Sequence, residues 1–133
     1  MPKTYETNGS TVFNGYNAVI EYLNGKLPAS SLAFIDGHPV EISVITRIEL
    51  LAWPGATTAH LEVLNNFIAS SIVHLLDEPV ILKIIEIRKT KRCKLPDAII
   101  ATTAIKKQLT LLTNNLADFS NIKNLSLANP HQL

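Results

Sequence analysis

Residues 95–113 read LPDAIIATTAIKKQLTLLT, and the rest of the chain can be interpreted outward from this stretch. Residues 97–107 have a helical pattern, and Pro96 suits the first turn because its missing amide hydrogen would have had no partner within the helix. Asp97 brings a carboxylate to the positive end of the helix dipole. Residues 109–113 form an apolar run that is long enough for a buried strand and too short for a typical helix. The stretch therefore predicts a helix followed directly by a strand.

Short apolar runs and helical patterns alternate along the whole chain. The expected strands are Ser10–Asn14, Val40–Ile45, Ile72–Leu76, Leu109–Thr113 and Leu125–Ala128. The expected helices are Asn17–Leu23, Ser30–Ile35, Arg47–Trp53, Thr58–Ser70, Glu78–Lys89 and Asp97–Lys107. Strands that alternate with helices form a mostly parallel sheet covered on both faces. Because 133 residues fit one domain and no linker is visible, we expect a single α/β domain.

Composition excludes several classes of protein. Hydrophobic residues make up 47% of the chain and charged residues 17%, a balance typical of a compact domain and unlike that of a disordered chain. No stretch supplies the roughly 18 apolar residues of a membrane span, so we expect no membrane contact and a cytoplasmic location. Cys93 is the only cysteine, and no Cys/His set has zinc-finger spacing. A nucleotide-binding domain would need a Gly-rich phosphate loop, which the sequence lacks.

Side chains with oxygen ligands lie at the ends of several expected elements. In an open parallel sheet, ligands bind beyond the carboxyl ends of the strands. The side chains that could converge there are Glu49, Asp97, Asn115 and Asp118. Carboxylate and amide oxygens suit Mg²⁺ or Mn²⁺. Each acid also has a structural interpretation: Thr46 and Glu49 have capping-box spacing, Asp97 opens a helix, and Asp118 fits a surface turn.

Three successive segments resemble the motifs of one protein family. They are residues 46–55 (TRIELLAWPG), 94–104 (KLPDAIIATTA) and 111–119 (LLTNNLADF). In this order they look like the motifs of PIN-domain ribonucleases, and most of all like the VapC-type toxins of bacterial toxin–antitoxin pairs. Residues 17–25 (NAVIEYLNG) also resemble the helix that follows the family's first motif.

The resemblance implies a three-layer α/β/α sandwich with a parallel five-stranded sheet in the order 3-2-1-4-5. It further implies a magnesium or manganese site that cuts single-stranded or loop RNA, in which the metal positions and acidifies the attacking water. Carried over by position, the metal ligands would be Glu49, Asp97 and Asp118. Asn115 would complete the catalytic set, and Thr113 and Asn17 would orient it.

The first motif departs from the family pattern. Members end the first strand with Asp, Thr and Asn, whereas here Gly15 stands at the acid and Tyr16 at the threonine. A second register would put Glu6 at the acid as a substitute metal ligand, but it requires an insertion before the next helix. We prefer Gly15, because residues 11–13 read better as a buried strand, and residues 1–10 then form an N-terminal extension. Loss of one carboxylate predicts a weaker metal site.

Two functional hypotheses follow. The first is a metal-dependent endoribonuclease of the PIN-domain toxin type, weakened at Gly15, and the alternative is a catalytically idle PIN-like protein that binds RNA or an antitoxin. The expected partners are RNA, an antitoxin protein and a second copy of the chain. Half of the basic residues lie between Lys83 and Lys94, which predicts a positive edge. The residues of this edge expected to bind RNA phosphates are Arg88, Lys89, Lys91, Arg92 and Lys94.

A partner surface is expected on two of the helices. Residues 30–35 and 58–70 carry many large apolar side chains, and one small domain need not bury them all. They are Leu32, Phe34, Ile35, Leu61, Leu64, Phe67 and Ile68. The alternative is that these side chains belong to the ordinary core.

Overall fold

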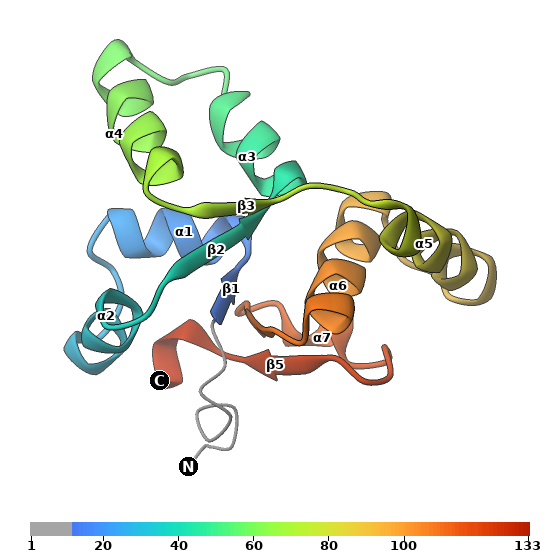
Figure 1. Ribbon diagram of the computed structural model, residues 1–133. Coiled ribbons are helices and arrows are strands. Elements are labelled where there is room, and N and C mark those ends of the chain that lie inside the picture. Colours follow the sequence, from blue (N-terminus) through green and yellow to red (C-terminus); the bar gives the residue numbers. More distant parts are fainter. Residues whose placement is uncertain (1–11) are drawn as a thin grey trace.

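A five-stranded sheet forms the centre of the computed structural model, which describes residues 12–133 (Figure 1). Its strands are β1 (Val12–Asn14), β2 (Val40–Ser43), β3 (Ile72–His74), β4 (Thr110–Leu112) and β5 (Ser126–Ala128). All neighbouring strands are parallel and their order is β3-β2-β1-β4-β5. The predicted order 3-2-1-4-5 is therefore confirmed. The expected N-terminal extension, with Glu6, lies outside the described residues.

Helices occupy the connections between the strands. The six long ones are α1 (Tyr16–Leu23), α2 (Ala29–Asp36), α3 (Val44–Leu51), α4 (Thr58–Ala69), α5 (Glu78–Thr90) and α6 (Leu95–Lys107). All six were expected from the sequence patterns. The sequence patterns do not predict α7 (Leu116–Phe119) or the 3₁₀ helix Pro130–Gln132, because segments this short show no periodicity. Within residues 12–133, no helix has the length and apolar character needed to cross a membrane.

Helices cover both faces of the sheet, as the α/β/α prediction requires. On one face, Val12 and Leu112 pack in one cluster with Ala18 of α1 and Ile35 of α2. Beside this cluster, α3 and α4 pack against β2 and α1. The opposite face is covered by α6 and α7, and α5 packs on the outside of α6. Figure 1 shows this division, with α1, α2 and α4 on one side of the sheet and α5 and α6 on the other.

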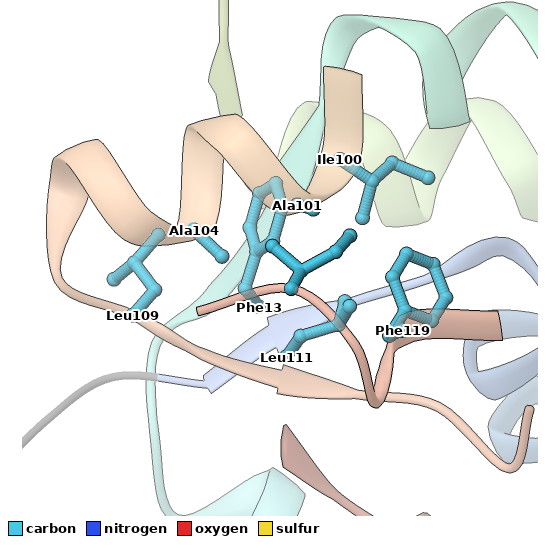
Figure 2. Packing of buried hydrophobic residues seen from close by; sticks show 8 residues of the cluster. Phe13, Ile100, Ala101, Ala104, Leu109, Leu111 and Phe119 are labelled. Carbon is cyan, nitrogen blue, oxygen red and sulfur yellow. The ribbon is translucent and has the colours of Figure 1, made fainter. Parts of the chain in front are cut away.

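The core beneath α6 fixes the position of that helix on the sheet. Phe13 of β1 and Leu111 of β4 are neighbours in register, and neither side chain is exposed to solvent. Figure 2 shows Ile100, Ala101 and Ala104 of α6 facing these two residues. Ala101 and Ala104 are fully buried, and their small side chains let the helix approach the sheet closely. This packing sets where the first turn of α6 lies relative to the strand ends.

One ionisable pair is buried under the same face. Glu41 of β2 is only 6% exposed, and its Oε1 lies 2.5 Å from Nε2 of His74 on the edge strand β3. The ring of His74 also meets Phe13 edge-on, with ring centroids 5.9 Å apart. The pair therefore connects the edge strand to the core.

The predicted partner surface on residues 30–35 and 58–70 is largely part of the core. Ile35, Leu64 and Ile68 are buried, because α2 and α4 turn these side chains toward the sheet. Large apolar side chains are exposed elsewhere, on α5 and the segment before it. They are Leu75, Leu76, Ile81, Leu82 and Ile85.

The predicted capping box of Thr46 and Glu49 is wrong. Helix α3 begins at Val44, and its N-cap is Ser43, whose Oγ accepts a hydrogen bond from the amide of Ile45 at 3.1 Å. Thr46 instead lies inside the helix, fully buried, and its hydroxyl has no hydrogen-bond partner among the described residues. The sequence hides this boundary, because apolar and polar residues alternate from Val40 to Val44 as in a strand, and β2 continues into the helix without a break.

The corrected cap predicts opposite outcomes for two conservative changes. Ser43→Ala removes the cap and should lower the free energy of unfolding by about 1 kcal/mol. Thr46→Val removes a buried hydroxyl that has no partner and keeps the shape of the side chain, so it should be neutral or slightly stabilising. Urea denaturation of both variants measures the difference. A larger loss of unfolding free energy for Thr46→Val than for Ser43→Ala would show that Thr46 is the cap.

Candidate active site

The carboxyl ends of the central strands open into a small pocket of about 180 Å³. Gly15 follows β1 and Thr113 follows β4, so both lie at this end of the sheet. Glu49 of α3 and Asp97 of α6 line the same pocket. Two carboxylates that are 48 positions apart in the sequence thus reach one place.

Glu49 owes its position to the start of α3. The helix begins directly after β2, and Glu49 lies in its second turn with the side chain half-buried. Burial raises the pKa of the Glu49 carboxyl above its usual range, and the negative charge of Asp97 raises this pKa further. The charge of Asp97 therefore acts on Glu49 across the pocket.

Asp97 lies in the first turn of α6, where Pro96 is also found. Burial raises the pKa of the Asp97 carboxyl, and the charge of Asp118 adds to this increase. Lys94, just before the helix, acts in the opposite direction and lowers the same pKa. Asp97 is thus the acid whose charge interacts with both other carboxylates of the predicted metal site.

The segment after β4, which includes the short helix α7, holds Thr113, Asn115 and Asp118. Thr113 is buried, and its Oγ1 accepts a hydrogen bond from the amide of Asn115 at 3.0 Å. The side-chain amide of Asn115 donates to Oδ2 of Asp118 at 2.6 Å. Asn115 and Asn17 line the pocket of Glu49 and Asp97, whereas Asp118 lies in an adjoining pocket. Thr113 therefore fixes the turn from which Asn115 reaches Asp118.

Gly15 occupies the end of β1, where the family's first acid was expected. Its amide donates to the carbonyl oxygen of Leu112 at 3.2 Å, which ties the first turn of α1 to β4. A Cβ atom at this position would lie 3.3 Å from the same carbonyl oxygen, a tight contact. The φ angle of −75° is open to any residue. The backbone therefore does not require a glycine here.

The residues of the predicted basic edge lie in different surroundings in the structure. Arg92 and Lys94 line the adjoining pocket together with Asp97 and Asp118. Arg88 instead donates to the carbonyl oxygen of Cys93 at 3.0 Å, so part of its donor capacity holds the loop between α5 and α6. Lys89 and Lys91 line neither pocket.

Tyr16 is a pocket residue to which the sequence patterns give no role. It opens α1 and lines the acidic pocket beside Gly15. The only signal for it is its position in the sequence, where the family pattern has a threonine.

The donor set fits a hard cation that keeps much of its water. A cation placed beside Glu49 and Asp97 would offset the neighbouring negative charges that raise their pKa values, and oxygen donors are the ligands that Mg²⁺ prefers. In the described part of the chain, however, no three Asp, Glu, His or Cys residues are gathered closely enough to hold a metal ion. A cation held by Glu49 and Asp97 would therefore take most of its ligands from water.

The sequence profile of the PIN domain matches residues 17–125, which is most of the chain. The chain belongs to the PIN-domain family. The matched region begins two residues after Gly15. No curated protein sequence matches the chain significantly.

Solved structures of toxin–antitoxin complexes have the same fold as this PIN domain. DNA-bound VapBC from Salmonella typhimurium matches with a TM-score of 0.75 and 23% identity over 90% of this chain and 98% of that chain. VapBC2 from Rickettsia felis, bound to a promoter fragment, matches with a TM-score of 0.74 and 24% identity over 90% and 98%. FitAcB from Neisseria gonorrhoeae gives a TM-score of 0.70 and 25% identity over 92% and 100%.

The raised pKa values of the PIN-domain carboxylates predict how stability changes with pH. In the unfolded chain Glu and Asp titrate near about pH 4.3 and 3.9. Because folding raises both pKa values, the folded state favours the protonated forms. Their contribution to stability is complete below about pH 4 and is lost as pH rises through the folded pKa values.

Glu49→Gln should therefore raise the melting temperature at pH 7, without divalent cations, by about 1 to 3 °C. The gain should disappear near pH 4, where the wild-type carboxyl is protonated in both states. Glu62→Gln on the exposed side of α4 serves as the matched control and should change little. A Glu49→Gln chain that melts below the wild type at pH 7 would contradict the assigned repulsion.

Proposed function

We propose that this PIN-domain chain is the toxin subunit of a toxin–antitoxin pair and acts as a metal-dependent endoribonuclease of the VapC type. One observation carries the proposal: Glu49 and Asp97 share a pocket at the carboxyl ends of β1 and β4, with Asp118 next to it. The fold shared with VapBC and FitAcB complexes supports the same conclusion. An RNA substrate would place its activity in the cytoplasm.

Each residue of the site has a proposed task. Glu49, Asp97 and Asp118 would hold Mg²⁺ or Mn²⁺, in part through water, with Asn115 keeping Asp118 in place. When bound, the cation would acidify a water for attack on the phosphodiester and neutralise charge on the phosphoryl oxygens. Arg92 and Lys94 line the pocket on the far side of Asp97, where they can bind the flanking phosphate.

The glycine at position 15 favours a weak enzyme. It also supports an alternative function without catalysis. With no carboxylate at the end of β1, a cation would be held by fewer charges and more water. A chain that binds RNA or an antitoxin without cutting RNA would follow if the remaining acids are insufficient. Glu6 would restore a ligand only if the N-terminal segment reached the site.

The proposal predicts that Gly15→Asp increases cleavage. The new carboxylate would lie at the end of β1, beside Glu49 and Asp97, and should raise Mn²⁺ affinity and the Mg²⁺-dependent rate on single-stranded RNA by about tenfold or more. Calorimetry and a cleavage assay measure the two effects. The φ angle of −75° suits Asp, although the contact with Leu112 requires a small adjustment.

Three variants make the cleavage test specific. Gly15→Ala adds the same Cβ without the carboxylate and should leave activity at the wild-type level. Asp97→Asn should abolish cleavage, and any activity that survives this change belongs to a contaminant. Glu6→Gln should lower activity only if Glu6 is the substitute ligand. If neither the wild type nor Gly15→Asp cleaves RNA with Mg²⁺ or Mn²⁺, the idle binding protein is the better description.

We also propose that the chain forms a homodimer through α5. Ile81, Leu82 and Ile85 of this helix are 36%, 57% and 46% exposed, and Leu75 and Leu76 in the segment before it are also exposed. Patches of this kind mark protein interfaces. An antitoxin is the second protein partner that the fold relationship suggests.

Leu82→Glu should therefore convert the chain to a monomer at micromolar concentration, because a charge would be buried in the interface. Sedimentation velocity measures the change. Val63→Glu is the control, since Val63 is 52% exposed on α4, away from α5. A wild-type chain that sediments as a monomer would rule out this dimer.

A further inference from the structure

A second pocket lies between α1 and α4, next to the acidic one. Its volume is about 450 Å³, within the range of small-molecule sites. The residues that line it are Tyr16, Ile20, Leu23, Asn24, Trp53, His60, Val63 and Leu64. None of them is an acid, a lysine or an arginine. The pocket therefore suits an uncharged, largely apolar group with a polar edge that Asn24 could bind.

The aromatic part of this pocket is held in place before any ligand arrives. The rings of Trp53 and His60 stack with centroids 4.7 Å apart and an angle of 22° between their planes. His60 is fixed by a capping box at the start of α4: its Nδ1 accepts from the amide of Thr57, and its own amide donates to Thr57 Oγ1, both at 3.1 Å. Trp53 nevertheless remains 40% exposed. A rigid aromatic surface of this kind loses little entropy when a flat ring stacks on it.

This pocket is continuous with the proposed cleavage site. Tyr16 lines both the aromatic pocket and the acidic pocket. On the other side, Asp97 is shared between the acidic pocket and the one lined by Arg92 and Lys94. Three neighbouring pockets thus follow one another: one aromatic and uncharged, one acidic, and one that combines Arg92 and Lys94 with Asp97 and Asp118.

Single-stranded RNA has matching chemistry. Each nucleotide presents an uncharged flat base and a charged phosphate, and unpaired bases stack on aromatic side chains. We propose that the pocket of Trp53 binds a nucleobase of the RNA strand whose phosphodiester lies at Glu49 and Asp97. This assignment rests on the proposed ribonuclease function and adds the part of the substrate that is recognised. A protein segment in the same pocket is the competing occupant that the experiment must exclude.

The sequence offers a direct probe, because Trp53 is its only tryptophan. With the full chain in EDTA, which prevents metal-dependent cleavage, a base stacked on Trp53 should quench the intrinsic fluorescence. The two ligands to compare are a hexamer of adenylate and an abasic hexamer with the same phosphates. The adenylate hexamer should quench the signal and bind at least about fivefold more tightly than the abasic one.

Variants of Trp53 test the same contact by fluorescence anisotropy of a labelled hexamer. Trp53→Leu should weaken binding of the adenylate hexamer by about fivefold to a hundredfold, whereas Trp53→Phe should retain most of the affinity because it still stacks. Ile72→Ala, which removes an apolar side chain that is 51% exposed on the edge strand β3, should leave RNA affinity unchanged. Circular dichroism verifies that each variant is folded, and the wild-type comparison of the two hexamers stands without any variant.

The outcomes separate this inference from the proposed function. If RNA is bound or cleaved, but both hexamers bind equally and Trp53 is not quenched, the base site is wrong and the nuclease proposal stands. If neither hexamer binds and no RNA is cleaved, both proposals fail. If Trp53→Leu leaves RNA affinity unchanged but weakens self-association or binding of a co-expressed antitoxin, the pocket is a protein interface and the base site is overturned.

Discussion

Strand β1 is hydrogen-bonded to both β2 and β4, and the site depends on this parallel pairing. Parallel pairing puts the carboxyl ends of all three strands at one edge of the sheet, so the segments that follow them must start near one another. Gly15, Val44 and Thr113 are those starting points. The burial of Phe13 and Leu111 beneath α6 then fixes the first turn of that helix against the same edge. Neither Glu49 nor Asp97 could reach the pocket if this pairing were lost.

Like charges brought together in this way are unfavourable in the absence of a counterion. Burial raises the pKa of Glu49 and of Asp97. The charge of Asp97 adds to the increase at Glu49 and that of Asp118 to the increase at Asp97, where Lys94 acts in the opposite direction. Such a cost is typical of sites that gain from binding a charged ligand. Gly15, at the end of β1, brings no negative charge to this edge. An acid at this position would raise both the repulsion and the attraction for a cation, which links the stability of the fold to the strength of the site.

Long-range order was more predictable from this sequence than local detail. The strand order was available because three motifs occur together in the sequence, and Glu49, Asp97 and Asn115 do reach one pocket. The start of α3 differs from the prediction because apolar and polar residues alternate from Val40 to Val44, so Ser43 fits a strand pattern as well as a helix cap. The capping box of α4 escaped notice because its third helical residue is His60, where the usual pattern has Glu or Gln. The aromatic pocket depends on packing between α1 and α4, which no local pattern encodes.

The buried pair of Glu41 and His74 has a consequence for how the edge of the sheet is specified. Side chains alternate between the faces of a strand, so a slip of β3 by one residue along β2 would carry His74 to the opposite face. Glu41 would then lie buried beneath α6 without its hydrogen-bond partner, at a cost of about 1 to 3 kcal/mol. A three-residue edge strand has few backbone hydrogen bonds with which to resist such a slip. The hydrogen-bonded pair therefore fixes the register of a strand that is too short to align itself.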